Sequence, residues 1–319
     1  MLIQRWIATG PPDPTTGEGL ALITEELAAP APGEITIEVV SAAVNPADLK
    51  HARAATEFPH PLGYEVAGRV VAIGSDTTIA SGPVAPGDDV LAFRVRGGYA
   101  SALNVPAAAV FAKPPTLGFD AAAGLLLAAT TAADMLRAAA ARQGELVLVH
   151  GASGAVGSAL LQLARSRGIR VIGTGAPKHL DRIAALDVVP VAYGPGLTER
   201  VREAAAMTPL AAVLDAAGTD EAINTSLALA TDISQIVTVA APRRAAAHGF
   251  VALAGRQPRS AAYRDQVRAE IIGLAAAGEL SSPPLHAYPL NQAPQALADV
   301  AGGHLGGKAI LHPAPWPAN

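Results

Sequence analysis

The sequence predicts an α/β protein in which a doubly wound parallel sheet is joined to a second, β-rich part. Three observations support this prediction. Apolar runs alternate with helix-period stretches from residue 145 to about residue 255. A glycine-rich turn follows the first of these runs. Residues 1–117 instead hold short β-branched runs broken by proline and glycine, which is typical of antiparallel strands.

The glycine-rich turn holds Gly151, Gly154 and Gly157, between an apolar run and a helix-period stretch that leads into a second apolar run. This order is that of a dinucleotide-binding βαβ unit, in which backbone N–H groups and a helix N-terminus face a pyrophosphate. Strands are expected at 146–149, 170–173, 188–192, 212–215, 236–239 and 250–253. Mostly joined by helices, they predict a sheet of Rossmann type.

The change in pattern along the chain predicts two domains. We expect a β-rich catalytic domain over 1–118 and 260–319, and a dinucleotide-binding domain over 119–259. Outside the Rossmann strands, we expect strands at 35–40, 68–73, 89–93 and 308–311, helices at 263–277 and near 294–300, and a disordered tail after residue 313.

The composition narrows the class of protein. The 319 residues include no cysteine, so a disulfide framework, a thiolate zinc site and a cysteine nucleophile are excluded. No apolar run reaches about 18 residues, and the N-terminal stretch lacks the apolar core of a signal peptide. A net charge of −4 without a basic cluster argues against nucleic acid. We expect a cytoplasmic protein with a small-molecule partner and no membrane partner.

Two other glycine-containing motifs compete with a dinucleotide-binding turn at these residues. The stretch 151–155 nearly matches the nucleophile elbow G-x-S-x-G, but alanine replaces the last glycine and no convincing partner acid and histidine accompany it. A P-loop is excluded because the sequence contains no Gly-Lys-Ser/Thr. A dinucleotide turn therefore remains the favoured reading.

The second Rossmann strand distinguishes between the two nicotinamide cofactors. An acidic residue at its end would bind a free ribose 2′-hydroxyl, but Gly173 and Thr174 lead into Gly-Ala without a carboxylate. Lys178, His179 and Arg182 follow and can meet a phosphate dianion. The sequence thus favours NADPH over NADH, although these three side chains would also fit a solvated helix start.

With these features in place, nearly the whole chain resembles the medium-chain dehydrogenase/reductase superfamily. It is most similar to the zinc-independent branch of quinone oxidoreductases and enoyl or alkenal reductases. Besides the turn, the resemblance rests on motifs at 33–34, 44–48, 61–68, 86–90, 97–100, 129–133, 213–218 and 307–311.

The resemblance implies a barrel-like, GroES-like β domain beside the Rossmann domain, with a C-terminal segment returning to the first domain. Zinc-dependent members bind catalytic zinc through thiolate and imidazole ligands. The matching positions here are Asn45, Tyr64 and a residue near Leu127, none of which forms a credible zinc site. We therefore expect no metal.

Without a metal or a nucleophile, the remaining chemistry is hydride transfer to a carbon that is already electrophilic. Asn45, Tyr64 and Lys50 are the candidate catalytic residues, as hydrogen-bond or proton donors to the acceptor oxygen. The resemblance implies that Asn45 also lies beside the nicotinamide. The alternatives are a cap before Pro46, an ordinary half-buried tyrosine and a solvated lysine.

The other predicted cofactor-binding residues lie in the turn, after strand ends or in family motifs. The resemblance implies that Thr131 contacts the nicotinamide end, that Tyr193 lies near the adenosine phosphate and that Lys308 lies near the cofactor. Strand ends of an open parallel sheet bind ligands, and small residues there allow close approach. The full set is Asn45, Thr131, Ser153, Gly154, Ala155, Val156, Gly173, Thr174, Lys178, His179, Tyr193, Ala216, Gly218, Val239, Ala240 and Lys308.

These observations predict an NADPH-dependent, zinc-independent reductase of quinones or α,β-unsaturated carbonyls. Two alternatives remain: an enoyl-thioester reductase, which basic residues such as Arg94 and Arg96 would favour, and a non-catalytic NADPH-binding structural or regulatory protein. We also expect a homodimer, because residues 249–253 are β-rich and fall at the expected sheet edge, where unpaired backbone groups invite a second copy.

Overall fold

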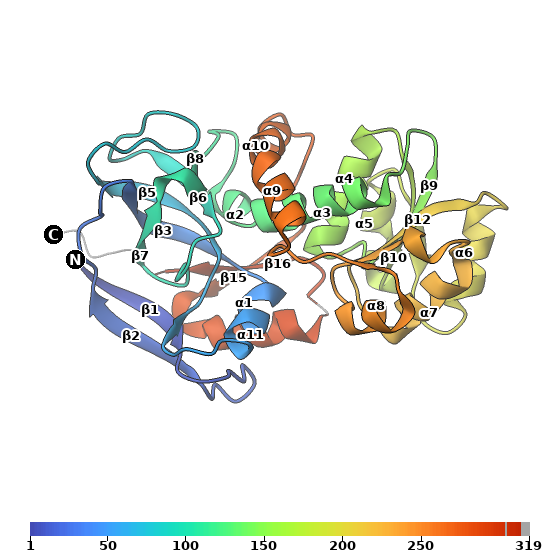
Figure 1. The fold of residues 1–319 in the computed structure, drawn as a ribbon, viewed down its shortest axis with the longest axis horizontal. Coiled ribbons are helices and arrows are strands. Elements are labelled where there is room, and N and C mark those ends of the chain that lie inside the picture. Colours follow the sequence, from blue (N-terminus) through green and yellow to red (C-terminus); the bar gives the residue numbers. More distant parts are fainter. Residues whose placement is uncertain (304, 314–319) are drawn as a thin grey trace. The chain divides into compact units, whose positions relative to one another are not determined.

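The structure, a computed structural model, describes residues 1–303 and 305–313. The chain forms two compact units. The first unit comprises residues 1–127 together with the C-terminal segment from residue 284, and the second unit comprises residues 128–283. The predicted fold class, a Rossmann sheet plus a β-rich domain, is confirmed (Figure 1).

The first unit is built mainly from antiparallel strands. One sheet has the order β2-β1-β4, and the other has the order β15-β16-β3-β5-β6-β8, with β7 also paired to β3. The strands are β1 Leu2–Ala8, β2 Leu20–Glu26, β3 Glu34–Val44, β4 His60–Pro61, β5 Glu65–Ile73, β6 Asp89–Phe93, β7 Ala102–Pro106, β8 Val110–Ala112, β15 Leu285–Pro289 and β16 Lys308–His312. The helices are α1 Pro46–Arg53, α2 Phe119–Ala123 and α11 Ala293–Gly302, with short 3-10 turns at Ala107–Ala109 and Leu290–Gln292.

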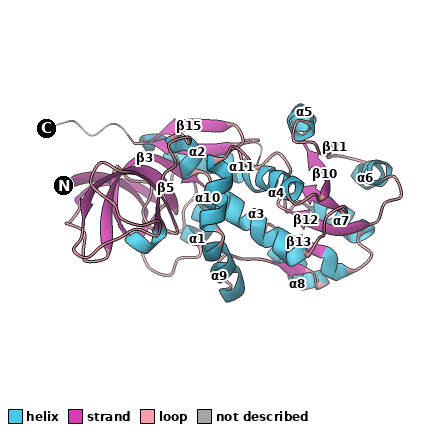
Figure 2. Ribbon diagram, turned by 90° about the horizontal axis from the view of Figure 1, so that it is seen from above, coloured by secondary structure: helices cyan, strands magenta, loops and turns pink. Residues whose placement is uncertain are grey.

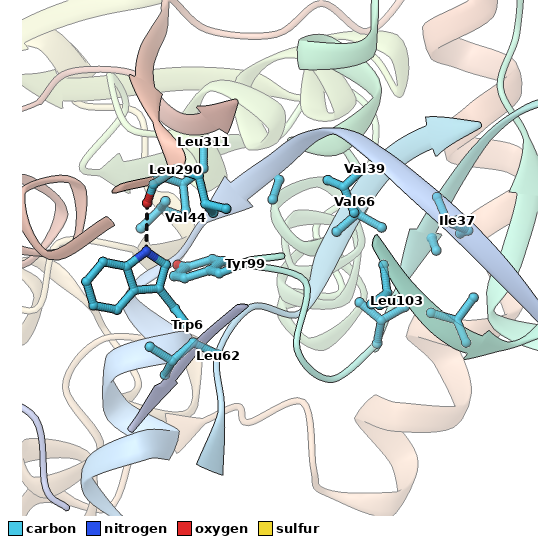
Figure 3. Packing of buried hydrophobic residues seen from close by; sticks show 14 of the residues in the cluster. Trp6, Ile37, Val39, Val44, Leu62, Val66, Tyr99, Leu103, Leu290 and Leu311 are labelled. Carbon is cyan, nitrogen blue, oxygen red and sulfur yellow. Dashed lines mark hydrogen bonds between the residues drawn. The ribbon is translucent and has the colours of Figure 1, made fainter. Parts of the chain in front are cut away.

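The core of the first unit joins the N-terminal strand to the C-terminal segment (Figure 3). Trp6 of β1 is 8% exposed, and its indole Nε1 donates a hydrogen bond to the Leu290 carbonyl oxygen at 2.7 Å. Tyr99, Leu62 and Leu311 belong to the same buried cluster. Because buried indole N–H groups need an acceptor, this bond satisfies Trp6 while tying the two ends of the unit together.

The second unit contains one parallel sheet with the strand order β11-β10-β9-β12-β13-β14, and Figure 2 shows its strands and helices. Counted along the chain from β9, this is the 3-2-1-4-5-6 order of a dinucleotide-binding fold. The strands are β9 Leu146–His150, β10 Arg170–Gly175, β11 Val189–Ala192, β12 Leu210–Asp215, β13 Ile236–Thr238 and β14 Val251–Ala252. The helices are α3 Leu126–Ala139, which starts in the first unit, α4 Ala155–Ser166, α5 Leu180–Ala184, α6 Leu197–Ala205, α7 Asp220–Leu229, α8 Pro242–His248, α9 Pro258–Gln266 and α10 Arg268–Ala276, with 3-10 turns at Pro177–His179 and Ile233–Gln235.

The sheet of the second unit is apolar along its strands because it is covered by helices. All five residues of β9 are buried, as expected for a central parallel strand. Leu148 and Ile172 belong to an apolar cluster that also contains Val201 of α6 and Ile223 of α7. Because the strands are parallel, their carboxyl ends lie at one edge of the sheet, next to this apolar core.

The two units meet in the sequence at 127/128 and 283/284, whereas the sequence predicts domain boundaries at 118/119 and 259/260. Helix α2 belongs to the first unit, where Asp120 accepts hydrogen bonds from Ser41 of β3 at 2.5 Å and lies 2.7 Å from His312 of β16. Residues 260–283 belong to the second unit, because Gln162 of α4 bonds to Ser281 at 2.8 Å. Side-chain partners far away in sequence set these boundaries.

Most predicted elements are present, with changed bounds. The predicted helix 263–277 is two helices, α9 and α10, because the backbone departs from helical geometry at Val267 (φ −86°, ψ −1°). The predicted strand 250–253 is shortened to the two residues of β14. The predicted disordered tail lies outside the described residues.

Candidate functional site

The glycine turn between β9 and α4 is folded tightly onto itself. Gly151 has φ +76°, in the left-handed region that favours glycine. A Cβ atom on Gly157 would lie 2.1 Å from the Gly151 carbonyl oxygen, so no larger residue fits there. A Cβ on Gly154 would meet only that same oxygen, at 3.4 Å. The turn is therefore closed on its inner side and free of side-chain bulk at Gly154.

Helix α4 begins at this turn without a side-chain cap. Gly154 is the N-cap, and no side chain accepts a hydrogen bond from the first turn of the helix. The first N–H groups of an α-helix have no acceptor within the helix, and the dipole makes this end positive. The N–H groups at Ala155 and Val156 thus suit an anion, and the residues present fit the pyrophosphate of a dinucleotide.

Cationic side chains gather beyond the end of β10. Residues 173–180 hold no carboxylate, and Lys178 is exposed. Arg182 of α5 donates from Nη2 to the Ser153 carbonyl oxygen at 3.0 Å, which brings its guanidinium to the glycine turn. Partial burial, together with the positive charges of Arg182 and Lys178, lowers the pKa of His179. The region is electropositive and fits a phosphate group.

Other predicted cofactor-binding residues lie at the same edge of the sheet. Tyr193 follows β11, is 45% exposed, and its backbone N–H donates to the Gly175 carbonyl oxygen at 3.1 Å. Gly218 follows β12, with φ +71°, and a Cβ there would lie 2.8 Å from the Cβ of Ala240 after β13. Ala216 and Val239 take part in the same two turns, and their backbone N–H groups bond to the His150 and Asp215 carbonyl oxygens.

Thr131 is held by a buried ion-pair cluster in the second unit. Its hydroxyl accepts a hydrogen bond from Nη1 of Arg264 at 2.9 Å. Arg264 is 6% exposed and also donates from Nε to Asp134 at 3.1 Å, while Arg137 binds the other oxygen of Asp134 at 2.6 Å. The position of Thr131 thus depends on helix α9.

In the first unit, the Glu65 carboxylate joins three distant segments. Its Oε1 accepts from Nδ2 of Asn45 at 3.0 Å and from Nζ of Lys308 at 2.8 Å. Its Oε2 accepts from the Leu127 backbone N–H at 2.9 Å. Lys308 also donates to Oδ1 of Asn45. Since Asn45 and Lys308 are 2% and 3% exposed, this cluster fixes the amide orientation of Asn45.

A second buried pair lies beside this cluster. Oδ2 of Asp48 accepts from the Asn45 backbone N–H and from the Tyr99 hydroxyl, both at 2.7 Å. Its Oδ1 is buried and has no hydrogen-bond partner among the described residues. Burial raises the pKa of Asp48 to about 7, although the Tyr99 and Asn45 bonds act in the opposite direction.

Of the other two candidate catalytic residues, Lys50 lines a small cavity of the first unit and Tyr64 does not. Lys50 is exposed and, with Asn45, lines a cavity of about 270 Å³ between α1 and α11, two helices that lie side by side in Figure 1. Tyr64 is half-buried, and its ring meets the His51 ring edge-on at a centroid distance of 5.1 Å. The cavity wall is otherwise lined mainly by apolar side chains of α1 and α11.

Several buried polar residues were not singled out from the sequence as site residues. Glu65 begins strand β5, whereas His150 and Asp215 end β9 and β12, and each is at most 1% exposed. A charged or polar residue at either end of an apolar strand is a usable signal, because buried polar groups require partners. Thr238 and Arg264 carry no comparable local signal.

Residues 1–303 and 305–313 contain no cluster of three or more histidine, cysteine, aspartate or glutamate side chains that could hold a metal ion. In the same part of the chain, no helix is both long and apolar enough to cross a membrane.

Two family models match this chain: the alcohol dehydrogenase GroES-like domain over residues 31–115 and the zinc-binding dehydrogenase over residues 190–311. The spectinabilin polyketide synthase system protein NorB of Streptomyces orinoci is 30% identical over 309 residues, covering 91% of this chain and 14% of that protein. The quinone oxidoreductase of Rattus norvegicus is 35% identical over 172 residues, 51% of either chain. The chain thus spans about half, or much less, of the curated relatives it matches.

A solved mycobacterial structure, a complex with NADPH, is 25% identical with a TM-score of 0.84, covering 97% of this chain and 100% of its own. Together with the family models, these relatives show that the chain belongs to the medium-chain dehydrogenase/reductase superfamily. Its predicted place in the quinone oxidoreductase branch is also confirmed.

The Glu65–Lys308 pair gives a stability prediction. We expect Lys308→Met to lower the free energy of unfolding by about 3–5 kcal/mol, because it leaves the buried Glu65 carboxylate without its cation. Urea unfolding measures the loss. Arg202→Met is the control, since its ion pair with Glu199 is exposed and contributes at most about 1 kcal/mol. Equal losses in the two variants would contradict the prediction.

Asp48 gives a prediction on pH. Below about pH 4 the carboxyl is protonated in both states. As the pH rises towards the folded pKa of about 7, only the unfolded state has lost the proton, so the free energy of unfolding falls and then levels off. We expect Asp48→Asn to gain stability relative to the wild type as the pH rises from about 4 to about 7 in urea titrations. A difference between Asp48→Asn and the wild type that stays constant over this pH range would refute the assignment.

Proposed function

We propose that this chain is an NADPH-dependent, zinc-independent oxidoreductase that reduces quinones or α,β-unsaturated carbonyls. The observation that carries the proposal is the uncapped start of α4 at the carboxyl edge of the parallel sheet, with cations and no carboxylate after β10. Similarity to quinone oxidoreductases and to a mycobacterial structure in complex with NADPH supports it.

Backbone groups of the glycine turn would bind the pyrophosphate. Ser153, Ala155 and Val156 present N–H groups at the positive end of α4. The N–H of Gly154 donates to the Gly151 carbonyl oxygen, and its missing side chain leaves space for close approach. At the ends of β12 and β13, small side chains at Ala216, Gly218 and Ala240 would allow the rest of the dinucleotide to lie against the sheet edge. Tyr193 would contact the adenosine end.

The 2′-phosphate would be bound by Lys178 and His179, with Arg182 behind them. A dianion beside His179 would favour the protonated ring, because it offsets the neighbouring positive charges that lower the pKa of His179. Gly173 and Thr174 add no negative charge, and the first carboxylate after β10 is Asp181 in α5.

Residues of the first unit would orient and protonate the acceptor. Bound NADPH supplies a hydride to an electrophilic carbon. Asn45 would position the reacting groups. Its amide is fixed, because Nδ2 donates to Glu65 and Oδ1 accepts from Lys308. The Tyr64 hydroxyl and the Lys50 ammonium would donate to the oxygen on which charge develops.

Removing the predicted phosphate contact tests the cofactor proposal. We expect Lys178→Ala to weaken NADPH binding about tenfold or more and to leave NADH binding unchanged, because a charge-assisted bond to phosphate contributes about 1.5–3 kcal/mol. Fluorescence titration measures both dissociation constants. Arg170→Ala, at the opposite end of the same strand, is the matched control. A tenfold loss for both cofactors would count against the 2′-phosphate contact.

A direct assay tests the reaction. The purified protein should oxidise NADPH faster than NADH when it is given phenanthrenequinone or a short enone. Activity only on a secondary alcohol with added zinc would reject the proposal. Tight NADPH binding without turnover across a panel of quinones and enones would favour the non-catalytic alternative.

Enoyl-thioester reduction is a second candidate function. It is favoured by similarity to a polyketide synthase system protein and to an erythronolide synthase, which match 91% and 89% of this chain. The same hydride delivery would act on an acyl thioester, with Arg96, an exposed cation, available to an anionic carrier. Comparing kcat/KM for a free enone and its coenzyme A thioester separates the two candidates.

We further propose a homodimer formed through the edge of the Rossmann sheet. Strand β14 is an end strand of that sheet, and a second copy can pair with such an edge. The strand is only two residues long, and Gln257 already donates to its Ala252 carbonyl oxygen at 3.2 Å. Sedimentation at micromolar concentration should show a dimer, and a monomer alone would exclude it. Cytoplasmic localisation stays a prediction.

A further inference from the structure

A row of four buried polar side chains crosses the sheet of the second unit. His150 of β9 is in register with Thr174 of β10 on one side and with Asp215 of β12 on the other, and Asp215 is in register with Thr238 of β13. All four are at most 3% exposed. Side chains in register on adjacent parallel strands point to the same face, so these four form the last row of that face.

The row follows directly on the apolar core. Two residues before its members stand Ile172, Leu148, Val213 and Ile236, which all belong to one apolar cluster. The face therefore changes from apolar to polar at the carboxyl end of every one of these strands. Ligands of open parallel sheets bind beyond this end.

The Asp215 carboxylate holds the turn that follows its own strand. Oδ1 accepts from the backbone N–H groups of Ala217 at 3.0 Å and Gly218 at 2.9 Å. Oδ2 accepts from the hydroxyl of Thr238 at 2.6 Å. One carboxylate oxygen therefore binds the turn after β12, and the other binds Thr238 of β13.

The Thr238 hydroxyl holds the second turn. While it donates to Asp215, its oxygen accepts from the backbone N–H groups of Ala240 and Ala241, both at 3.0 Å. One hydroxyl therefore links the turn after β12 to the turn after β13. The two turns also touch, because a Cβ on Gly218 would lie 3.0 Å from the Ala240 carbonyl carbon.

His150 is no counter-ion to Asp215. Burial lowers the pKa of His150 to about 4 even though Asp215 acts to raise it, so the ring is neutral near pH 7. Its Nδ1 lies 3.0 Å from the Thr174 hydroxyl oxygen. The Asp215 carboxylate consequently has the turn N–H groups and the Thr238 hydroxyl as its hydrogen-bond partners.

We propose that Asp215 and Thr238 are positioning residues for the dinucleotide, which fix the turns at 216–218 and 239–241 as one binding surface. Both side chains are fully buried, so they act through the turns and do not touch the cofactor. The proposal rests on the proposed function, since it takes these turns as cofactor-binding.

Thr238→Val tests the proposal, because valine has nearly the same shape and lacks the hydroxyl. We expect about a tenfold weaker affinity for NADPH in fluorescence titrations, with Thr238→Ser close to the wild type. The KM for NADPH should rise, whereas the KM for the quinone or enone should not. In the protein without cofactor, hydrogen exchange at the amides of residues 217, 218, 240 and 241 should become faster.

Thr225→Val is the matched control. Thr225 is also buried, but its hydroxyl pairs with Thr198 of α6 and not with either turn. This variant should leave NADPH affinity and exchange in the two turns unchanged. Asp215→Asn is the second variant if Thr238→Val does not fold: with one acceptor oxygen in place of two, it should also weaken NADPH binding.

The outcomes separate this proposal from the proposed function. A wild-type protein that binds no NADPH would reject the proposed function, while exchange in the cofactor-free protein would still report whether the turns are linked. Wild-type binding of NADPH with equal affinity in Thr238→Val would overturn the positioning role. Equal weakening in Thr225→Val would overturn it as well, because the loss would then be general.

Discussion

The architecture of the first unit depends on the burial of one carboxylate. Glu65 lies in strand β5 at 1% exposure, and an isolated buried charge is very costly. Its partners are Lys308, the Asn45 amide and the Leu127 backbone N–H. They come from β16, the start of α1 and the start of α3, so the same interaction that satisfies Glu65 also holds the segments around the candidate catalytic residues.

The sheet of the second unit is subject to two opposing requirements. It must be apolar to pack under helices and polar to bind a charged ligand at one edge. On one face of the sheet the side chains change from apolar to polar between two successive rows, from Leu148 to His150 in β9 and from Val213 to Asp215 in β12. The apolar sheet thus supports a polar row in which Asp215 and Thr238 hold the short turns that follow their strands.

The sequence predicts an element well where the element's own hydrophobic pattern or glycine spacing identifies it. The strand at 89–93 is predicted with the bounds observed, and the βαβ pattern predicts the glycine turn and a parallel sheet of Rossmann type. Fold class is therefore readable from periodicity and turn chemistry. The first strands, β1 and β2, were not assigned individually, because β2 is only half-buried and shows no clear alternation.

What could not be predicted depends on partners far away in sequence. Lys308 is expected from the resemblance to lie near the cofactor, yet its ammonium is buried between Glu65 and Asn45. The domain boundaries shifted because Asp120 and Ser281 have partners in other elements. No periodicity records such pairings, and the roles of the candidate site residues remain proposals.

The pairing of Glu65 with Lys308 has a consequence for synthesis on the ribosome. These residues are 243 positions apart, and translation at about 5–20 residues per second separates their emergence by roughly 10–50 s. During that interval the nascent chain has the carboxylate but not its cation, and β3 lacks its neighbour β16. All strands of the parallel sheet, residues 146–252, are synthesised before Lys308, so this later part of the chain can fold before the first unit is complete.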